Sequence, residues 1–276
     1  MARNNLSLIV LNTKKSAIWR FFLLCLFYLP SLAVAQNCPS NHYDESVIVK
    51  HVHDGDTVKL VDGRKIRLIG INAPEVARDN LPAEAYALQA RDHLRNLLTK
   101  HDNRARLIHG NESIDHYKRS LAHLFLPDGT NLQSQLLSSG LATEITIPPN
   151  QRFSDCYQQA EKQAICDKKA LWSQKILSVA DLKNSANGFR VLKGKIQKIE
   201  SSRSGLWLVM EHGLSLRIAF KHKSLFDMNR LSSLINQNVI IRGWLQTKKQ
   251  PKQGERFYMQ IKHPSAIEQE KNALKC

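Results

Sequence analysis

Apolar and polar residues alternate along two neighbouring stretches, 46–61 and 64–71, and the pair Asp62-Gly63 separates them. Alternation with a period of two residues is typical of a half-buried β-strand. A short Asp-Gly connection between two such runs favours a hairpin. The first folded element is therefore expected to be a β-hairpin.

Three segments instead repeat apolar residues every three or four positions, which indicates amphipathic helices. They are 81–100, 131–140 and 154–172. The first has a proline in its expected first turn, the second ends at Gly140, and the third begins at Ser154 as its N-cap. Two further strands are expected at 105–110 and 119–126.

The pattern changes beyond residue 188, where five short strand-like runs follow one another with one helical interruption at 223–235. The runs are 190–200, 206–212, 214–220, 238–246 and 256–263. Such a series predicts a small β-barrel or sandwich. The segment before it, 176–187, carries few large apolar side chains after Leu182 and is expected to be a linker.

The first 35 residues combine a basic start, a short apolar run and the ending Ala33-Val34-Ala35. This order is typical of a secretory signal peptide that is cleaved near Ala35. A retained membrane anchor is the alternative, but a spanning helix needs about 20 apolar residues. We therefore expect a secreted or periplasmic protein with no stable membrane insertion after cleavage.

Positive charge is concentrated in the C-terminal third of the chain. The whole chain has a formal net charge of +16, and residues 188–276 hold 17 Lys and Arg against 6 Asp and Glu. Such an excess favours polyanionic partners such as nucleic acid or an anionic membrane surface. A basic face that only keeps the protein soluble is the alternative. No protein partner is predicted.

Four cysteines remain after the expected cleavage: Cys38, Cys156, Cys166 and Cys276. An even number of cysteines in an exported chain indicates two disulfides. Cys156 and Cys166 would lie about 15 Å apart along one helix, so each is expected to bind one of the terminal cysteines, with the pairing left open. Metal ligation is less favoured, because the sequence has no Cys-x-x-Cys spacing.

Oxygen-bearing groups cluster around the predicted hairpin. Hard cations such as Ca²⁺ are held by carboxylate and carbonyl oxygens, which Asp56, Asn72 and the backbone of Ala73 could supply. Glu75 follows closely and could take a proton from a water molecule. Each of these residues also has an ordinary explanation, as part of a turn or as the start of a loop.

Two arginines complete this set. Arg67 and Arg119 could each give two hydrogen bonds to a phosphate whose charge grows during a reaction. A metal site, a base and two arginines together predict a phosphodiester hydrolase. The alternative for Arg67 is a structural ion pair with an acidic residue.

Five motifs carry a resemblance to a known family: DGDT, IRLIGINAPE, DHYKRSLA, NLQSQLLSSGLA and AEKQAICDKKALW. In order and spacing they resemble the staphylococcal nuclease-like (thermonuclease) family over residues 46–172. The resemblance implies an α+β fold that is mainly β, with a five-stranded oligonucleotide/oligosaccharide-binding (OB) barrel and three helices. It also implies Ca²⁺-dependent, sugar-nonspecific hydrolysis of DNA and RNA that leaves 3′-phosphates.

The resemblance also assigns roles to single residues of this chain. It implies that Asp56 and the carbonyl of Ala73 bind Ca²⁺, and that Asp54 and Thr57 shape the metal loop. It implies that Glu75 is the general base and that Arg67 and Arg119 bind the scissile phosphate. Tyr117 is implied to contact a phosphate of the bound nucleotide.

Three residues depart from the family pattern. Asn72 stands where the family commonly has a second calcium-binding aspartate, so an oxygen ligand stays but its charge is lost. His116 replaces a lysine beside the phosphates, and Thr146 falls where the best-known member has an aromatic residue that stacks on the base. Metal affinity and substrate binding by this domain are therefore expected to be weaker.

The basic C-terminal segment could compensate, because aromatic residues are interspersed with its positive charges. They are Trp207, Phe220, Trp244, Phe257 and Tyr258. Trp207 and Trp244 are expected to bind substrate, with single-stranded DNA or RNA favoured, by stacking as in single-strand-binding barrels. Core packing is the alternative for each aromatic residue.

This segment looks similar to an extra OB-type domain of some secreted bacterial homologues, so a second small β-barrel is expected after the nuclease-like one. The expected boundaries are 1–35 for the signal peptide, 36–175 for the nuclease-like domain, 176–187 for the linker and 188–270 for the accessory nucleic-acid-binding domain.

Two functions of other classes stay open. The first is a nucleic-acid-binding protein on a degenerate nuclease scaffold, for which Asn72 is a first sign of decay. The presence of Arg67, Glu75 and Arg119 counts against it. The second is a surface adhesin that uses the basic segment on anionic polymers. Binding without cleavage would distinguish both from a nuclease.

Overall fold

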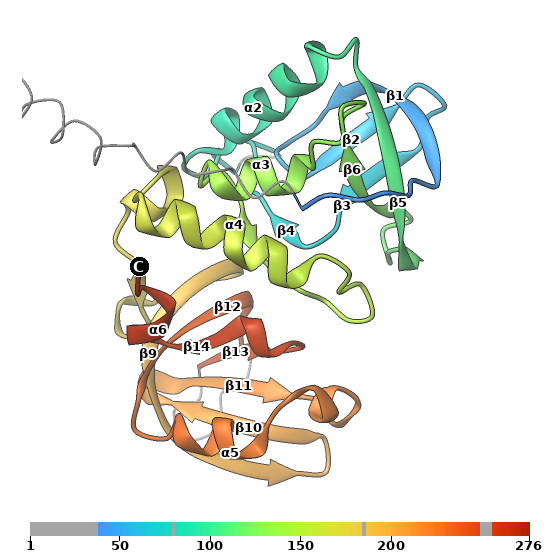
Figure 1. The fold of residues 1–276 in the computed structure, drawn as a ribbon. Coiled ribbons are helices and arrows are strands. Elements are labelled where there is room, and N and C mark those ends of the chain that lie inside the picture. Colours follow the sequence, from blue (N-terminus) through green and yellow to red (C-terminus); the bar gives the residue numbers. More distant parts are fainter. Residues whose placement is uncertain (1–37, 79–80, 184–185, 249–255) are drawn as a thin grey trace, which may run out of the picture. The chain divides into compact units, whose positions relative to one another are not determined.

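The computed structural model describes residues 38–78, 81–183, 186–248 and 256–276 (Figure 1). The chain from Ala35 to Cys276 forms one compact unit, and its described residues hold two separate hydrophobic cores, one for each of two β-sheets. The predicted signal peptide and its cleavage site near Ala35 lie outside the described residues. In the described part of the chain, no helix has both the length and the apolar character needed to cross a membrane.

The first sheet is a closed barrel of five strands in the order β1-β2-β3-β6-β5 (Figure 1). The strands are β1 (Glu45–Val52), β2 (Thr57–Leu60), β3 (Lys65–Leu68), β5 (Arg104–Ile114) and β6 (Ser120–Phe125). Strands β3 and β6 pair in parallel, and the other neighbours are antiparallel. The predicted five-stranded barrel is confirmed.

The stretch predicted as one hairpin contains three strands instead of two. Strands β2 and β3 form the expected hairpin, but a turn at 53–56 divides the stretch 46–61 into β1 and β2. The Asp54 side chain makes this turn, because its Oδ1 accepts a hydrogen bond from the backbone N–H of Asp56 at 2.9 Å. The turn leaves Asp56 directly before the first residue of β2.

Three helices accompany the barrel, as predicted. They are α2 (Ala87–Thr99), α3 (Leu132–Ser138) and α4 (Ser154–Cys166). Helix α2 begins later than expected, because Tyr86 at its N-cap has a φ of 66°, in the left-handed region that a helix does not continue through. The proline expected in its first turn therefore lies before the helix.

Helix α4 differs from its prediction at both ends. Its N-cap is Phe153 rather than Ser154, and the helix stops at Cys166. Trp172 lies in a separate 3₁₀ turn, η2 (Ala170–Ser173). Lys168, between these elements, and Ala170, the first residue of η2, have positive φ values, which interrupt a right-handed helix.

The second sheet contains the five strands predicted for the C-terminal segment and two short edge strands. In chain order they are β8 (Leu177–Ser178), β9 (Gly188–Ser202), β10 (Gly205–Met210), β11 (Leu214–Ile218), β12 (Asn238–Thr247), β13 (Phe257–Gln260) and β14 (Ile267–Gln269). The predicted helical interruption is α5 (Met228–Ser233), preceded by the 3₁₀ turn η5 (Phe220–Leu225), and α6 (Glu270–Ala273) follows β14.

Five strands of the second sheet form a ring, because β12 pairs with β9 as well as with β13. The ring runs β9-β10-β11-β13-β12, and the third and fourth strands in this order, β11 and β13, are parallel. The first barrel has the same cyclic order, with the parallel pair in the same place. The two rings therefore share one strand order.

The segment predicted as a linker, 176–187, also contributes to the second sheet and to its core. It contains β8, which pairs in parallel with β9, and the 3₁₀ turn η3 (Val179–Asp181). Val179 is fully buried and belongs to the C-terminal core together with Leu182. The low number of apolar residues hid this role, since only two of them in the described part of the segment, Val179 and Leu182, are buried.

A disulfide and a buried ion cluster tie the N-terminal half (38–175) to the C-terminal half (176–276). The two disulfides are Cys38–Cys156 and Cys166–Cys276, so each middle cysteine binds a terminal one, as expected. Arg242 on β12 pairs with Glu161 on α4. Its Nη1 also donates to the backbone carbonyl of Glu144 at 3.1 Å.

Candidate active site

The turn between β1 and β2 places Asp56 against the end of the short strand β4 (Ile71–Asn72). Gly55 makes the close approach possible, because a Cβ at this position would lie 2.6 Å from the Cβ of Ala73 and 2.7 Å from that of Ala90. The Asp56 Oδ2 then accepts a hydrogen bond from the backbone N–H of Ala73 at 2.7 Å. A side chain at position 55 would push these two segments apart.

The Asp56 carboxylate is the centre of the polar cluster. The residue is only 4% exposed, and its Oδ2 lies 3.0 Å from Nη2 of Arg67. Its Oδ1 accepts a hydrogen bond from the Thr57 hydroxyl at 3.1 Å. Burial raises the pKa of Asp56 to about 6, although the Arg67 guanidinium opposes the shift. The ion pair considered as the alternative for Arg67 is thus present, and it lies within the site.

Asn72 and Ala73 bring two further oxygens to the same place. Arg67 Nη2 donates to Oδ1 of Asn72 at 3.4 Å, and Asn72 Nδ2 donates to the Ala73 carbonyl at 3.2 Å. Strand β4 is held there by antiparallel pairing with β7 (Thr143–Glu144). The three residues predicted to bind a metal are therefore contiguous.

This donor set fits a hard cation. It offers carboxylate, amide and carbonyl oxygens, which Ca²⁺ and Mg²⁺ prefer. The buried Asp56 carboxylate is not fully neutralised by Arg67, as its raised pKa shows, so an added cation would be stabilised there. Across the residues that the structure describes, no group of three or more His, Cys, Asp or Glu could hold a metal ion, so a cation here depends on the amide and carbonyl oxygens as well.

Glu75 follows the candidate metal ligands and is fixed through its backbone. Its N–H donates to Oε2 of Glu84 at 3.0 Å, and its carbonyl accepts from the N–H of Glu84 at 2.9 Å. Partial burial, followed by the nearby Asp56 carboxylate, raises the pKa of Glu75. A carboxylate with a raised pKa is a better proton acceptor near neutral pH.

Arg119 reaches the same cluster from the turn before β6. Its Nε donates to Oδ2 of Asp115 at 2.8 Å, and its backbone N–H donates to Oδ1 of the same residue at 2.9 Å. Its Nη1 lies 3.5 Å from the Thr57 hydroxyl, which in turn bonds Asp56. The structure therefore brings both predicted arginines to one pair of neighbouring residues on the β1–β2 turn.

Asp115 is a residue of the site that the sequence interpretation missed. It fixes the guanidinium of Arg119 and shapes the turn that carries it. The signal was present in the sequence, since an acid four residues before an arginine in a tight turn can accept from both its backbone and its side chain.

Tyr117 and His116 lie on the same turn as Arg119. Tyr117 is 69% exposed, and the guanidinium carbon of Arg119 lies 5.3 Å from its ring centroid. The rings of His116 and Tyr117 are 3.8 Å apart. An exposed aromatic surface beside Arg119 is suited to contact with a nucleotide.

The two predicted substrate-binding tryptophans lie in the C-terminal half and in different surroundings. Trp207 on β10 has its ring centroid 5.8 Å from that of Tyr258 on β13, and Nζ of Lys248 lies 5.8 Å from the Trp207 ring. Trp244 on β12 instead packs edge-on against Phe189 at 5.2 Å. Phe257 is fully buried, so for this residue the core alternative holds.

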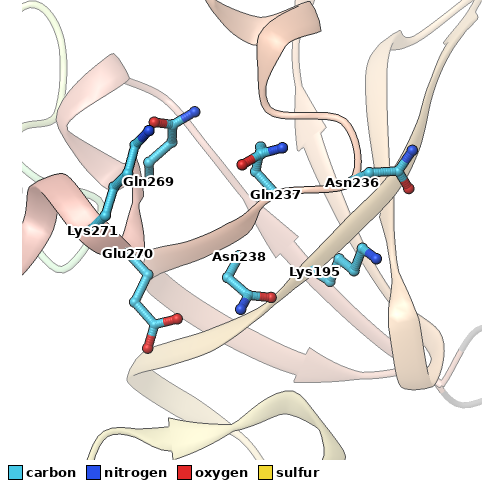
Figure 2. Close-up of a pocket in the computed structure, with 7 residues that line it drawn as sticks. All are labelled: Lys195, Asn236, Gln237, Asn238, Gln269, Glu270 and Lys271. Atoms are coloured by element: carbon cyan, nitrogen blue, oxygen red, sulfur yellow. The ribbon is translucent and has the colours of Figure 1, made fainter.

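A polar hollow of about 340 Å³ lies in the C-terminal half, near the ends of β9, β12 and β14 (Figure 2). Its lining residues are amides and charged side chains: Lys195, Asn236, Gln237, Asn238, Gln269, Glu270 and Lys271. None of the predicted site residues lines it. The hollow is therefore separate from the cluster around Asp56.

Comparison with known proteins agrees with this geometry. Residues 65–174 match the family described as staphylococcal nuclease homologue. The chain is 35% identical over 133 residues to the thermonuclease of Staphylococcus intermedius, which is 47% of this chain and 77% of that protein. It is 33% identical over 138 residues to the thermonuclease of Staphylococcus hyicus, covering 49% and 79%. It is 26% identical over 162 residues to the endonuclease YncB of Bacillus subtilis (strain 168), covering 51% and 76%.

Proposed function

This chain belongs to the staphylococcal nuclease family, and from that premise we propose that it is an exported, Ca²⁺-dependent nuclease that cleaves DNA and RNA and leaves 3′-phosphates. That it is a nuclease hydrolase follows from the family and from the relatives named thermonuclease and endonuclease. One observation carries the finer proposal: Arg67 and Arg119 converge on Asp56 and Thr57 beside three oxygen ligands and Glu75. The two disulfides support an address outside the cytoplasm.

The two guanidiniums would bind the scissile phosphate. Arg67 is held by Asp56 and by the carbonyl of Leu68, to which its Nη1 donates at 2.6 Å. Arg119 is held by Asp115. Because both are fixed before substrate binds, little reorganisation is needed when negative charge grows on the phosphate oxygens, which is the condition for strong transition-state stabilisation.

Glu75 would take the proton from the attacking water. Its backbone is fixed on both sides by Glu84, and its raised pKa brings its basicity closer to the pH at which it would act. A Ca²⁺ ion held by Asp56, Asn72 and the carbonyl of Ala73 would supply positive charge next to the phosphate. Proton transfer to Glu75 and charge stabilisation by the arginines then act on the same phosphorus centre.

Restoring a carboxylate at position 72 is expected to strengthen metal binding. In Asn72→Asp, the Ca²⁺ concentration for half-maximal cleavage should fall by at least about tenfold, because a full negative charge joins the oxygen ligands. The measurement is the cleavage rate of single-stranded DNA against Ca²⁺ concentration. Asn236→Asp, at an exposed asparagine of the C-terminal half, is the matched control and should leave the curve unchanged. An unchanged or weakened Ca²⁺ requirement in Asn72→Asp would contradict the proposed ligand set.

We also propose that the C-terminal half binds single-stranded nucleic acid on the outer face of β10, β11 and β13. Trp207 and Tyr258 lie on this face, since their strand neighbours Leu206, Leu208 and Phe257 are buried in the core. Arg217 lies directly across from Trp207 in the β10–β11 pair. Aromatic rings flanked by positive charge are suited to stacking bases and attracting phosphates.

Trp207→Ala is expected to weaken binding of a single-stranded DNA 20-mer at least about fivefold, because stacking contributes roughly 1 to 3 kcal/mol per base. Fluorescence anisotropy in the presence of chelator measures the Kd without cleavage. Phe220→Ala removes an aromatic ring of η5 that is 47% exposed and should leave the Kd unchanged. Equal affinities for the wild type and Trp207→Ala would exclude this face as the binding site.

A further inference from the structure

A groove of about 260 Å³ opens beside the candidate active site, and we call it the side groove. Asn72 and Pro74 of the candidate active site form one wall. Trp172 and Lys175 form another, and Phe189 and Arg190 of β9 complete it. Its walls therefore come from both halves of the chain.

One side chain of the side groove is hydrogen-bonded to Glu75, the proposed base. Glu84 lines the groove, and this carboxylate accepts from the backbone N–H of Glu75 through Oε2. Its Oε1 accepts from Nη1 of Arg190 at 3.3 Å. A strand of the C-terminal half is thus linked through one side chain to the loop that carries Glu75. The groove also adjoins the proposed phosphate site, because its lining residue Asn72 accepts a hydrogen bond from Arg67.

The lining combines the two chemical features that a nucleotide requires. Apolar and aromatic side chains form most of its surface, among them Leu171, Trp172 and Phe189. Two cationic side chains, Lys175 and Arg190, also line it. Aromatic rings stack on bases of any sequence, and cationic groups attract the phosphates on either side.

Trp172 also has a buried polar atom. Its indole Nε1 is buried and has no hydrogen-bond partner in the described part of the chain. Buried donors without partners are uncommon in native proteins, and each calls for an explanation. The guanidinium of Arg242 lies 6.0 Å from the centroid of the same ring.

The size of the groove limits its occupant. A volume of about 260 Å³ lies below the roughly 300 to 1,000 Å³ of sites that enclose a whole small-molecule ligand. One base with its sugar, as part of a longer strand, is an occupant of suitable size. The same groove is less suited to a duplex, in which the bases are stacked inside and are not free to enter.

Resting on the proposed nuclease function, we infer that the side groove is a subsite for one nucleotide flanking the scissile phosphate, with its base against Phe189 and Trp172 and its phosphate near Lys175. The match to the nuclease family ends at residue 174. Six lining residues lie beyond it: Lys175, Ile176, Leu177, Phe189, Arg190 and Val191. The C-terminal half therefore contributes directly to the substrate-binding surface beside the active site, in addition to any separate binding face.

The test uses short single-stranded DNA with one ordinary phosphodiester linkage and phosphorothioates elsewhere. One nucleotide at a time is made abasic, at the first, second and third positions on each side of the ordinary linkage. In the wild type, one of these positions is expected to lower kcat/KM at least about fivefold, the fold-change of a lost base stack. In Phe189→Ala, the same abasic substitution should cause a smaller further loss than in the wild type, because one of the two stacking rings is already gone.

Two further variants keep the test decisive if Phe189→Ala folds poorly. Lys175→Glu changes an exposed side chain of the groove. The slope of log KM against the logarithm of the salt concentration should fall by about one. Lys223→Glu, an exposed lysine of η5, is the matched control and should change it less. Phe220→Ala serves as the control for loss of an aromatic ring.

The results separate this inference from the proposed function on which it rests. Abasic penalties that are the same at every position in Phe189→Ala and in the wild type, together with equal salt dependence in Lys175→Glu and Lys223→Glu, would overturn the subsite. In that case the wild type still cleaves. Absence of cleavage by the wild type would instead overturn the nuclease proposal itself.

Discussion

Glu75→Gln is expected to lower kcat for cleavage of single-stranded DNA by about 100- to 10,000-fold, because the amide cannot accept a proton from water as a carboxylate does. The substitution keeps the size of the side chain and leaves the backbone contacts of residue 75 with Glu84 in place. Arg119→Ala is expected to cost about 100- to 1,000-fold in kcat, as for other fixed donors to a developing negative charge. Both losses should appear mainly in kcat.

Initial rates over a range of substrate concentrations separate kcat from KM in these variants. Glu200→Gln, at an exposed glutamate of β9, is the control for the first substitution and should retain wild-type activity. Thermal unfolding should be nearly unchanged in Glu75→Gln, because residue 75 is held by Glu84 through backbone groups that the substitution leaves in place. If Glu75→Gln and Arg119→Ala both keep more than about a tenth of the wild-type kcat, the assigned roles are wrong.

Arg242→Ala is expected to lower the free energy of unfolding by about 3 to 5 kcal/mol, the usual cost of leaving buried charges without a partner. Arg242 is 8% exposed, and the two acids beside it, Glu144 and Glu161, are 0% and 3% exposed. These acids lie on β7 and α4, whereas Arg242 lies on β12, so the loss would weaken the junction between the two halves. Urea unfolding followed by fluorescence measures the difference.

The destabilisation by Arg242→Ala should depend on pH in a defined direction. Burial raises the pKa of Glu144 to about 7 even with Arg242 present. A raised folded-state pKa means that stability is lost as pH rises from the unfolded value, near 4.5, through about 7. The unpaired carboxylate is therefore most costly at high pH, and the loss in Arg242→Ala should be larger at pH 8 than at pH 5.

An uncharged replacement of the whole cluster is the informative control. Arg242→Met combined with Glu144→Gln and Glu161→Leu should recover much of the stability, since no buried charge then lacks a partner. Arg230→Ala, at an exposed arginine of α5, should change the unfolding free energy by less than about 0.5 kcal/mol. A loss below about 1 kcal/mol in Arg242→Ala at pH 8 would show that the cluster does not stabilise the junction.

Local pattern predicted most of the strands and helices, because alternation and helical spacing reflect which face of an element is buried. It did not predict the start of α2 or the division of the first strand. Those depend on single backbone conformations, the left-handed Tyr86 and the turn made by Asp54. A hydrophobic pattern does not record such conformations, since it reports burial and not φ.

The candidate site was predictable to the extent that motifs near one another in the chain remain near one another in space. Asp56, Arg67 and Asn72 were found because β2, β3 and β4 follow in sequence. Arg119 comes near them through the parallel pairing of β3 with β6. This contact is long-range in sequence, and Arg119 was assigned to the site from the family resemblance. Arg190 lies beyond the residues that resemble the nuclease family, so its link to Glu84 was missed.

The central claim is that this chain hydrolyses nucleic acid at the Asp56 cluster with Ca²⁺. Its most direct test is incubation of purified residues 36–276 with single-stranded DNA and RNA in Ca²⁺, in Mg²⁺ and in chelator. The expected result is cleavage of both polymers in Ca²⁺, products that carry 3′-phosphates, and no cleavage in chelator. Binding without cleavage at any Ca²⁺ concentration would contradict the claim and leave a nucleic-acid-binding protein on a nuclease fold.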